Sequence, residues 1–158
     1  MMNIRNSLFV LGLLALLAGC GGPGDSADVP EAEPAGSTSV DIGNHVVHFS
    51  AQSTDQLPPE VARAYNIVRS KNRAMLTVSL QDKSSKAPVA GLVEVSAVNL
   101  TGQLKSVTMR QVEEGDAIYY IGDIAVANQE TLIFDISVTP EGAAKPAAVR
   151  FKRQFYSD

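Results

Sequence analysis

The sequence predicts an all-β domain, an immunoglobulin-like or fibronectin-like antiparallel β-sandwich of about seven strands with one short helix. Segments after residue 40 alternate apolar and polar residues with a period of two, which places one face of each segment in a core. Glycine, proline and acidic turn residues separate these segments. The single Cys excludes an intramolecular disulfide, so two packed sheets are needed to bury the apolar faces. A small closed β-barrel is the alternative.

The expected strands follow one another along the chain. Leu76, Val78 and Leu80 alternate with polar residues, and Val93, Val95 and Ala97 do the same. The clearest alternation lies at residues 131–138, where Leu132, Phe134, Ile136 and Val138 share one face. In chain order the strands are expected at residues 45–51, 76–81, 93–97, 105–112, 117–124, 131–138 and 147–155.

The connections carry their own signals. Pro58, Pro59 and Glu60 preset a first helical turn, and the apolar residues of the next turn fall on one side, which predicts a short helix ending before Asn66. Turns are expected at Thr101-Gly102, Glu114-Gly115-Asp116 and Pro140-Glu141-Gly142.

The last strand breaks its own pattern. Val149 and Phe151 point to the core, and strict alternation would send Arg153 inward after them. A β-bulge near Lys152 would turn Arg153 outward and return Phe155 to the core, so a bulge is expected there.

Residues 1–19 read as a lipoprotein signal peptide. Arg5 precedes an apolar run from Leu8 to Ala18, which is too short to span a bilayer as a helix. The run closes on Leu17-Ala18-Gly19-Cys20, which resembles the lipobox of bacterial lipoproteins. This resemblance implies cleavage before Cys20 and lipidation of its sulfur, so Cys20 is expected to be an anchor. Gly21 follows, and the absence of Asp there favours the outer membrane, facing the periplasm, over the inner membrane.

Residues 20–40 read as the lipidated Cys and a disordered acidic tether, and residues 41–158 as the β-sandwich domain. The tether carries Asp25, Asp28, Glu31 and Glu33 without Lys or Arg, and it is rich in Gly, Pro, Ser and Ala. Once these four acids and Arg5 are set aside, the formal charge of −4 falls to about −1 for the domain. The chain is therefore not expected to bind nucleic acid, which needs a basic stripe.

Four segments of the domain stand in a specific order and spacing. They are 64–74 (AYNIVRSKNRA), 99–104 (NLTGQL), 114–121 (EGDAIYYI) and 126–132 (VANQETL). Together they resemble the domain of unknown function 4426 family of proteobacterial exported proteins, over nearly all of residues 41–158. Family members more often carry an ordinary signal peptide than a lipobox. The resemblance implies a periplasmic all-β domain and carries over no activity and no site residue.

A basic segment is the first candidate site. Arg69, Lys71 and Arg73 follow the expected helix closely, and with Asn72 they form a local positive surface able to hold a carboxylate, a phosphate or an acidic partner. The alternatives are a solvated loop, or internal pairing with Glu113, Glu114 or Asp116, with Asn72 as a turn residue.

Tyr119 and Tyr120 extend this candidate patch. Adjacent residues on a strand face opposite sides, so one of the two lies near the surface and is available for recognition. The alternative is a core Tyr whose hydroxyl reaches the rim.

No cofactor or metal is expected. His45 and His48 are the only histidines, and a spacing of three on a strand sends them to opposite faces. The sequence also lacks the motifs of a nucleophile elbow, a zinc-protease helix and a phosphate-binding loop, which argues against an enzyme.

The expected function is therefore a membrane-anchored periplasmic lipoprotein with a non-catalytic protein-interaction or scaffold module, which binds an envelope protein through loops at one end. A periplasmic module that binds a small ligand or lipid, or that acts as a chaperone through an unpaired edge strand, is the alternative. An enzyme of unrecognised type is the third reading.

Overall fold

The computed structural model describes residues 36–157, so the expected signal peptide, Cys20 and most of the expected tether lie outside the described residues. Within that range the chain forms nine strands, one 3₁₀ helix and one α-helix. The elements are β1 (Ser39–Ile42), β2 (His45–Ser53), η1 (Thr54–Gln56), α1 (Pro59–Ala64), β3 (Arg73–Asp82), β4 (Gly91–Asn99), β5 (Leu104–Val107), β6 (Arg110–Glu114), β7 (Ala117–Ala125), β8 (Glu130–Pro140) and β9 (Ala147–Phe155). No helix within residues 36–157 has the length and apolarity needed to cross a membrane.

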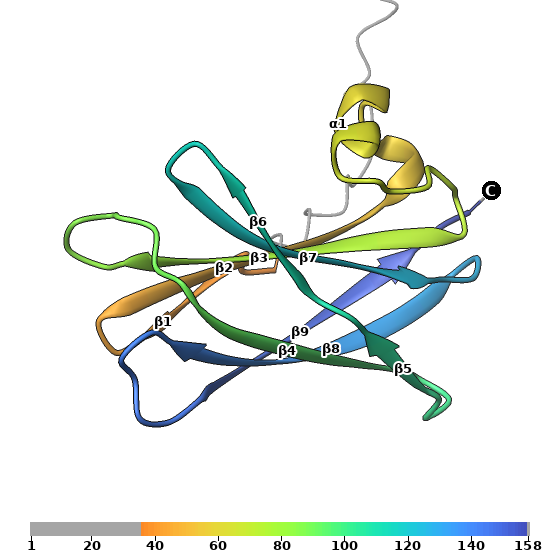
Figure 1. The fold of residues 1–158 in the computed structure, drawn as a ribbon. Coiled ribbons are helices and arrows are strands. Elements are labelled where there is room, and N and C mark those ends of the chain that lie inside the picture. The colour runs from red at the N-terminus through yellow and green to blue at the C-terminus, as the bar shows by residue number, and fades with distance from the viewer. Residues whose placement is uncertain (1–35, 158) are drawn as a thin grey trace, which may run out of the picture. The chain divides into compact units, whose positions relative to one another are not determined.

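The strands build two antiparallel sheets that pack face to face (Figure 1). The five-stranded sheet has the order β1-β2-β3-β7-β6, and the four-stranded sheet has the order β5-β4-β8-β9. The predicted all-β sandwich is confirmed, and the two sheets do not close into the alternative barrel.

The core lies between the sheets and follows the predicted alternation. On β8, Leu132, Phe134, Ile136 and Val138 are at most 1% exposed, while the residues between them are half-buried on the outer face. From the five-stranded sheet, Val47, Leu76, Val78 and Leu80 are fully buried against them. The ring of Phe151 on β9 lies 4.8 Å from that of Phe49 and 4.9 Å from that of Phe134, so aromatic rings fill the space between β2, β8 and β9.

The expected strand at 105–112 divides into β5 and β6, and the two halves join different sheets. The chain crosses between the sheets at Thr108 and Met109, directly over Gly122 of β7. A Cβ on Gly122 would lie 2.7 Å from Met109 Sδ and 2.9 Å from the carbonyl oxygen of Thr108. The single-strand prediction was wrong because no Gly or Pro marks the crossing.

The predicted helix is present as α1. It lies on the outer face of the five-stranded sheet, where Leu57, Ala62 and Met75 form a second small core. In Figure 1, α1 and the C-terminal end of β9 lie at the same end of the sandwich. β1 begins at Ser39, inside the range expected to be tether.

The expected bulge in β9 is absent. The β8–β9 register runs without interruption from Val138↔Ala147 to Glu130↔Phe155 and includes Leu132↔Arg153. Since Leu132 is fully buried, Arg153 starts from the inner face of the sheet, between Phe151 and Phe155. The prediction was wrong because β9 is an edge strand, where an inward charged side chain can still reach water.

Candidate functional site

The basic segment predicted as a site is held against the fold by Thr54. This side chain is fully buried at the start of η1. Its hydroxyl donates to the carbonyl oxygen of Val68 (2.8 Å) and accepts a hydrogen bond from the backbone N–H of Ser70 (2.9 Å). The chain between α1 and β3 is therefore pinned at two points just before the basic residues.

Two of the basic side chains are used inside the domain. The guanidinium group of Arg69 donates to the backbone oxygen of Asp55 at 2.6 Å. Arg73 forms an ion pair with Asp123, because the β3–β7 register sets Arg73 opposite Ala125 and Asp123 two residues away on the same face. Asp123 was not among the expected partners, and one of those, Glu114, instead accepts a hydrogen bond from Tyr65 (2.8 Å) that raises the pKa of Tyr65.

The remaining members of the segment lie on the surface. Lys71 and Asn72 are both exposed. The backbone N–H of Asn72 donates to Ser70 Oγ (3.1 Å), and its carbonyl oxygen accepts from the N–H of Val126 (2.9 Å). Asn72 thus lies in a turn, but its backbone groups hold it there and not its side chain, which the alternative had expected to bond nearby backbone.

The structure does not bring Tyr119 and Tyr120 to the basic segment. Both lie near the start of β7, whereas Arg73 is paired with Ala125 at the end of β7. At about 3.3 Å per residue, Tyr119 is about 20 Å from Ala125 along the strand. Tyr119 is half-buried on the outer face. Tyr120 is 5% exposed, and its hydroxyl bonds to the backbone of Gly91, so it is a core Tyr with its polar tip at the rim.

The two histidines are also apart. His48 shares the outer face of β2 with Ser50, since Val47 and Phe49 point to the core, and His45 falls on the inner phase. His48 Nε2 donates to Gln81 Oε1 at 3.2 Å. Within residues 36–157, no group of three or more His, Cys, Asp or Glu side chains is placed to hold a metal ion.

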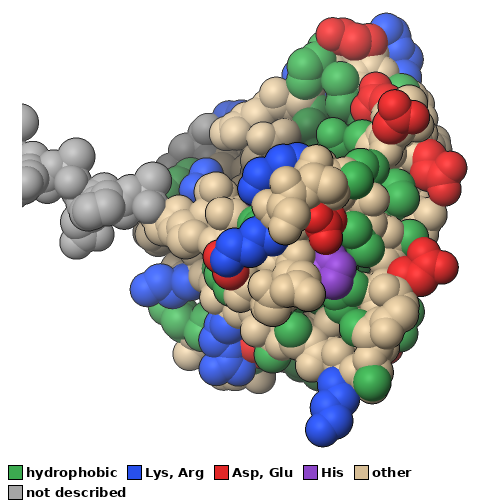
Figure 2. Space-filling view, turned by 90° about the vertical axis from the view of Figure 1, so that its left-hand side faces the viewer, with side chains coloured by type: hydrophobic (Ala, Val, Ile, Leu, Met, Phe, Trp, Pro, Cys, Tyr) green, Lys and Arg blue, Asp and Glu red, His purple; other side chains and the backbone are tan. Residues whose placement is uncertain are grey.

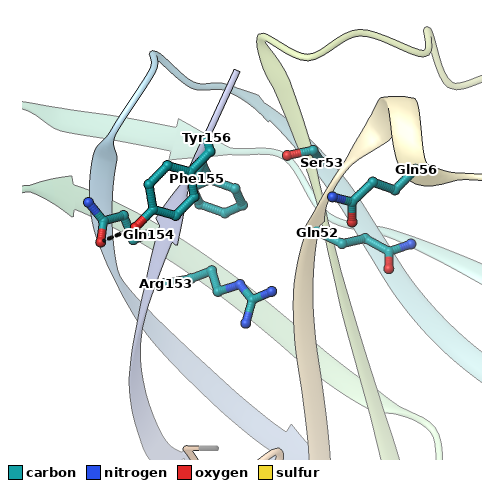
Figure 3. A pocket seen from close by; sticks show the side chains of 7 residues that line it. All are labelled: Gln52, Ser53, Gln56, Arg153, Gln154, Phe155 and Tyr156. Atoms are coloured by element: carbon teal, nitrogen blue, oxygen red, sulfur yellow. Dashed lines mark hydrogen bonds between the residues drawn. The ribbon is translucent and has the colours of Figure 1, made fainter. Parts of the chain in front are cut away.

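A cleft that sequence reasoning missed lies where the C-terminal ends of β2 and β9 meet. Its volume is about 90 Å³, and its lining comes from β2, η1 and the end of β9: Gln52, Ser53, Gln56, Arg153, Gln154, Phe155 and Tyr156. Figure 3 shows Arg153 extending from β9 across the cleft toward Gln52. We call this the Arg153 cleft. The one sequence signal for it was the broken alternation at Arg153.

The charge of the Arg153 cleft is not neutralised within the described chain. Its lining contains no Asp or Glu, and Arg153 has neither a hydrogen bond nor an ion pair with any of residues 36–157. Gln154 is engaged by the Tyr156 hydroxyl (3.0 Å), whereas Gln52 and Gln56 keep their amide groups available. A guanidinium group beside free amide donors is suited to a carboxylate or another planar anion.

A second, shallower hollow of about 400 Å³ lies on the outer face of the five-stranded sheet. Thr38, Ser50, Thr77 and Ser79 contribute hydroxyl groups to its lining, which also includes His48 and Phe49. Figure 2 shows the end of the molecule away from α1, where basic side chains lie mostly toward one side and acidic side chains mostly toward the other.

The family model described as "domain of unknown function (DUF4426)" matches residues 39–158. The chain belongs to this family. A crystal structure of a DUF4426 protein from Pseudomonas aeruginosa PAO1 is 31% identical to it over 76% of this chain and 94% of that chain, with a TM-score of 0.66. The resemblance seen in the four sequence segments is thereby confirmed. No curated protein matches the chain.

The DUF4426 domain also shares its fold with FetP of uropathogenic Escherichia coli strain F11. A copper-bound FetP variant is 12% identical over 76% of this chain and 95% of that chain, with a TM-score of 0.56. FetP as isolated after expression in the periplasm is 11% identical over 76% and 93%, with a TM-score of 0.54. At these identities the likeness shows the sandwich fold alone, and the copper is a property of FetP.

Proposed function

We propose that this DUF4426 protein is a lipid-anchored envelope protein whose β-sandwich is a non-catalytic interaction module. Cys20 in its lipobox-like context would hold the chain in the outer membrane, and the acidic tether would let the domain face the periplasm. The domain would then bind an envelope protein at the end of the sandwich that carries α1 and the end of β9.

The unpaired Arg153 in its polar cleft is the observation that carries this proposal. A cation with no partner in its own domain, flanked by free amide groups, is a feature that a binding partner can complete. The basic segment offers less, since Arg69 and Arg73 already bind Asp55 and Asp123.

The packing of the core does not favour a lipid carrier. Such a module needs an apolar chamber between its sheets, typically of about 300 Å³ or more. The packed rings of Phe49, Phe134 and Phe151 occupy that space between β2, β8 and β9. An unpaired edge strand, the other form of this alternative, is compatible with the cleft.

The test is a crosslinked pull-down of the full, lipidated chain from intact envelopes, with mass spectrometry. The wild type is compared with Arg153→Ala, with the matched control Lys152→Ala, and with a triple variant of the basic segment, Arg69→Ala, Lys71→Ala and Arg73→Ala. Lys152 directly precedes Arg153 in β9 and is exposed on the outer face, so it controls for lost charge.

We expect one or more envelope proteins to be enriched with the wild type and with Lys152→Ala, and to be lost with Arg153→Ala. Loss only in the triple variant would move the site back to the basic segment. No enriched protein with any form would overturn the interaction function itself.

A further inference from the structure

The second half of β2 has an open edge. β1 pairs only with His45–His48, and on that side the last backbone hydrogen bond from the described chain runs from the N–H of Phe49 to the carbonyl oxygen of Thr38 (2.9 Å). β2 itself continues to Ser53, paired with β3 along its other side as far as Ser53↔Ala74. Residues 50–53 therefore form an edge without a strand neighbour among residues 36–157.

The direction of the backbone groups on this edge follows from strand geometry. In an antiparallel ladder, alternate residues send both their N–H and their C=O to the same side. Since the N–H of Phe49 points toward β1, the backbone groups of Ala51 and Ser53 point to the open side as well. Among residues 36–157, no loop or side chain hydrogen-bonds to either residue on that side. Ala51 and Ser53 are only 7% and 6% exposed, because their side chains point into the sandwich, but their backbone groups on the open side have no partner in the described chain and could pair with an added strand.

The Arg153 cleft lies against this same edge. Gln52 and Ser53 of the edge belong to its lining, with Arg153 facing them from β9. A side chain on an added strand can thus reach the guanidinium group while the backbone pairs with β2. The 62% exposed Tyr156 adds an aromatic surface beside it.

Resting on the proposed interaction function, we infer that the partner supplies an extended acidic segment, which adds as a strand to the open edge of β2 while one of its carboxylates binds Arg153. The charge of the cleft selects this occupant. A second copy of this chain, paired through the same edge, would bring a second Arg153 toward the first, and like charges repel. A free anion would bind Arg153 and leave the backbone groups of Ala51 and Ser53 unused.

Three blocked eight-residue peptides serve as probes against the full chain in detergent. The first alternates Val with Glu. The second has Gln in place of each Glu, which removes the charge and keeps the strand. The third keeps each Glu and replaces every Val with Pro, which removes the backbone N–H at each replaced position and prevents continuous strand pairing. Binding is measured by fluorescence anisotropy with the wild type, Arg153→Ala and Lys152→Ala.

We expect the Val/Glu peptide to bind the wild type and Lys152→Ala alike, and Arg153→Ala about tenfold or more weakly, the loss typical of a charge-assisted hydrogen-bonded pair. Arg153 is exposed and has no partner in the described chain, so Arg153→Ala should unfold at the same urea concentration as the wild type. The Gln and Pro peptides should both bind at least tenfold more weakly than the Val/Glu peptide.

Other outcomes overturn the inference in separable ways. If the Gln peptide binds as tightly as the Val/Glu peptide, the partner's carboxylate is not needed for binding. If the Pro peptide binds as tightly, no strand is added to β2 and the cleft is a simple anion site. A partner that is captured from envelopes but crosslinks away from β2 and β9 leaves the proposed function standing and overturns the strand addition.

Discussion

The hydroxyl group of Tyr120 is bonded to both backbone groups of Gly91. It accepts a hydrogen bond from the N–H of Gly91 at 2.8 Å and donates one to its carbonyl oxygen, also at 2.8 Å. Tyr120 belongs to β7 of the five-stranded sheet, and Gly91 opens β4 of the four-stranded sheet. One buried side chain therefore joins the two layers of the sandwich.

We expect Tyr120→Phe to lower the free energy of unfolding by about 1–3 kcal/mol, because it leaves the N–H and C=O of Gly91 without their partner. Urea unfolding measures the change. Tyr119→Phe is the control, since the hydroxyl of the half-buried Tyr119 has no hydrogen bond in the described chain. Equal stability of the two variants would show that the Tyr120 bonds contribute nothing net.

Gly122→Ala should lower the free energy of unfolding by about 1–3 kcal/mol through overpacking. The added methyl group would meet the side chains of Met109 and Val107 and the carbonyl oxygen of Thr108, all within 2.9 Å. Flexible side chains can move aside, but the backbone oxygen moves only with the crossing from β5 to β6. Gly36→Ala is the matched control, because nothing lies within 4 Å of its added Cβ. A wild-type urea midpoint for Gly122→Ala would contradict the tight crossing.

The alternation of side chains was enough to predict the sandwich, because each interior position of β8 requires an apolar residue. The same alternation did not predict the point at which the chain crosses from one sheet to the other. Nothing in the local sequence at Thr108 and Met109 marks the move from one sheet to the other, since the condition that permits it is a glycine in another strand, Gly122.

The candidate site was predictable only in part for a similar reason. The inward phase of Arg153 is visible in the sequence, but whether such a charge is tolerated depends on β9 lying at an edge beside the open end of β2. The structural use of Arg73 depends on Asp123, which is 50 residues away. Short-range patterns carry no information on such partners.

Thr54→Val should loosen the basic segment. The substitution keeps the shape of the buried side chain and removes the hydroxyl, which leaves the carbonyl of Val68 and the N–H of Ser70 unpaired, at a cost of about 1–3 kcal/mol. Limited trypsin digestion with mass spectrometry should show faster cleavage after Arg69, Lys71 and Arg73. Thr54→Ser retains the hydroxyl and should protect these bonds better. Unchanged cleavage in Thr54→Val would mean that other contacts hold the segment.

Cys20→Ser should release the protein from the membrane. Acyl chains on Cys20 would contribute about 0.8 kcal/mol for each buried CH₂ group, so their loss removes the anchor. Fractionation of cells would measure the shift from membrane to soluble fractions, and mass spectrometry of the N-terminus would detect the lipid. Ser26→Ala, a few residues along the tether, should remain with the membrane. Membrane retention of Cys20→Ser would refute the lipoprotein assignment.

We expect the domain to lose stability in acid, because the ionised side chain of Glu130 stabilises the fold. Its side chain is 10% exposed and accepts hydrogen bonds from Lys105 Nζ (2.7 Å), Asn99 Nδ2 (3.0 Å) and the backbone N–H of Ala127 (2.8 Å). Burial raises the pKa of Glu130, but these bonds and the charge of Lys105 outweigh it, so the pKa lies below its usual value of 4.5.

A carboxyl group whose pKa is lowered by folding stabilises the folded state above its unfolded pKa, and this contribution is lost as the pH falls through the folded value. Glu130→Gln removes the contribution at every pH. We therefore expect the variant to be less stable than the wild type at neutral pH, and the difference in unfolding free energy to shrink from about pH 5 downward. Urea unfolding across this range measures it, with Glu94→Gln as a control for the loss of one exposed carboxylate. A gap between wild type and Glu130→Gln that stays constant into acid would mean that the carboxylate charge of Glu130 does not stabilise its contacts with Asn99 of β4 and Lys105 of β5.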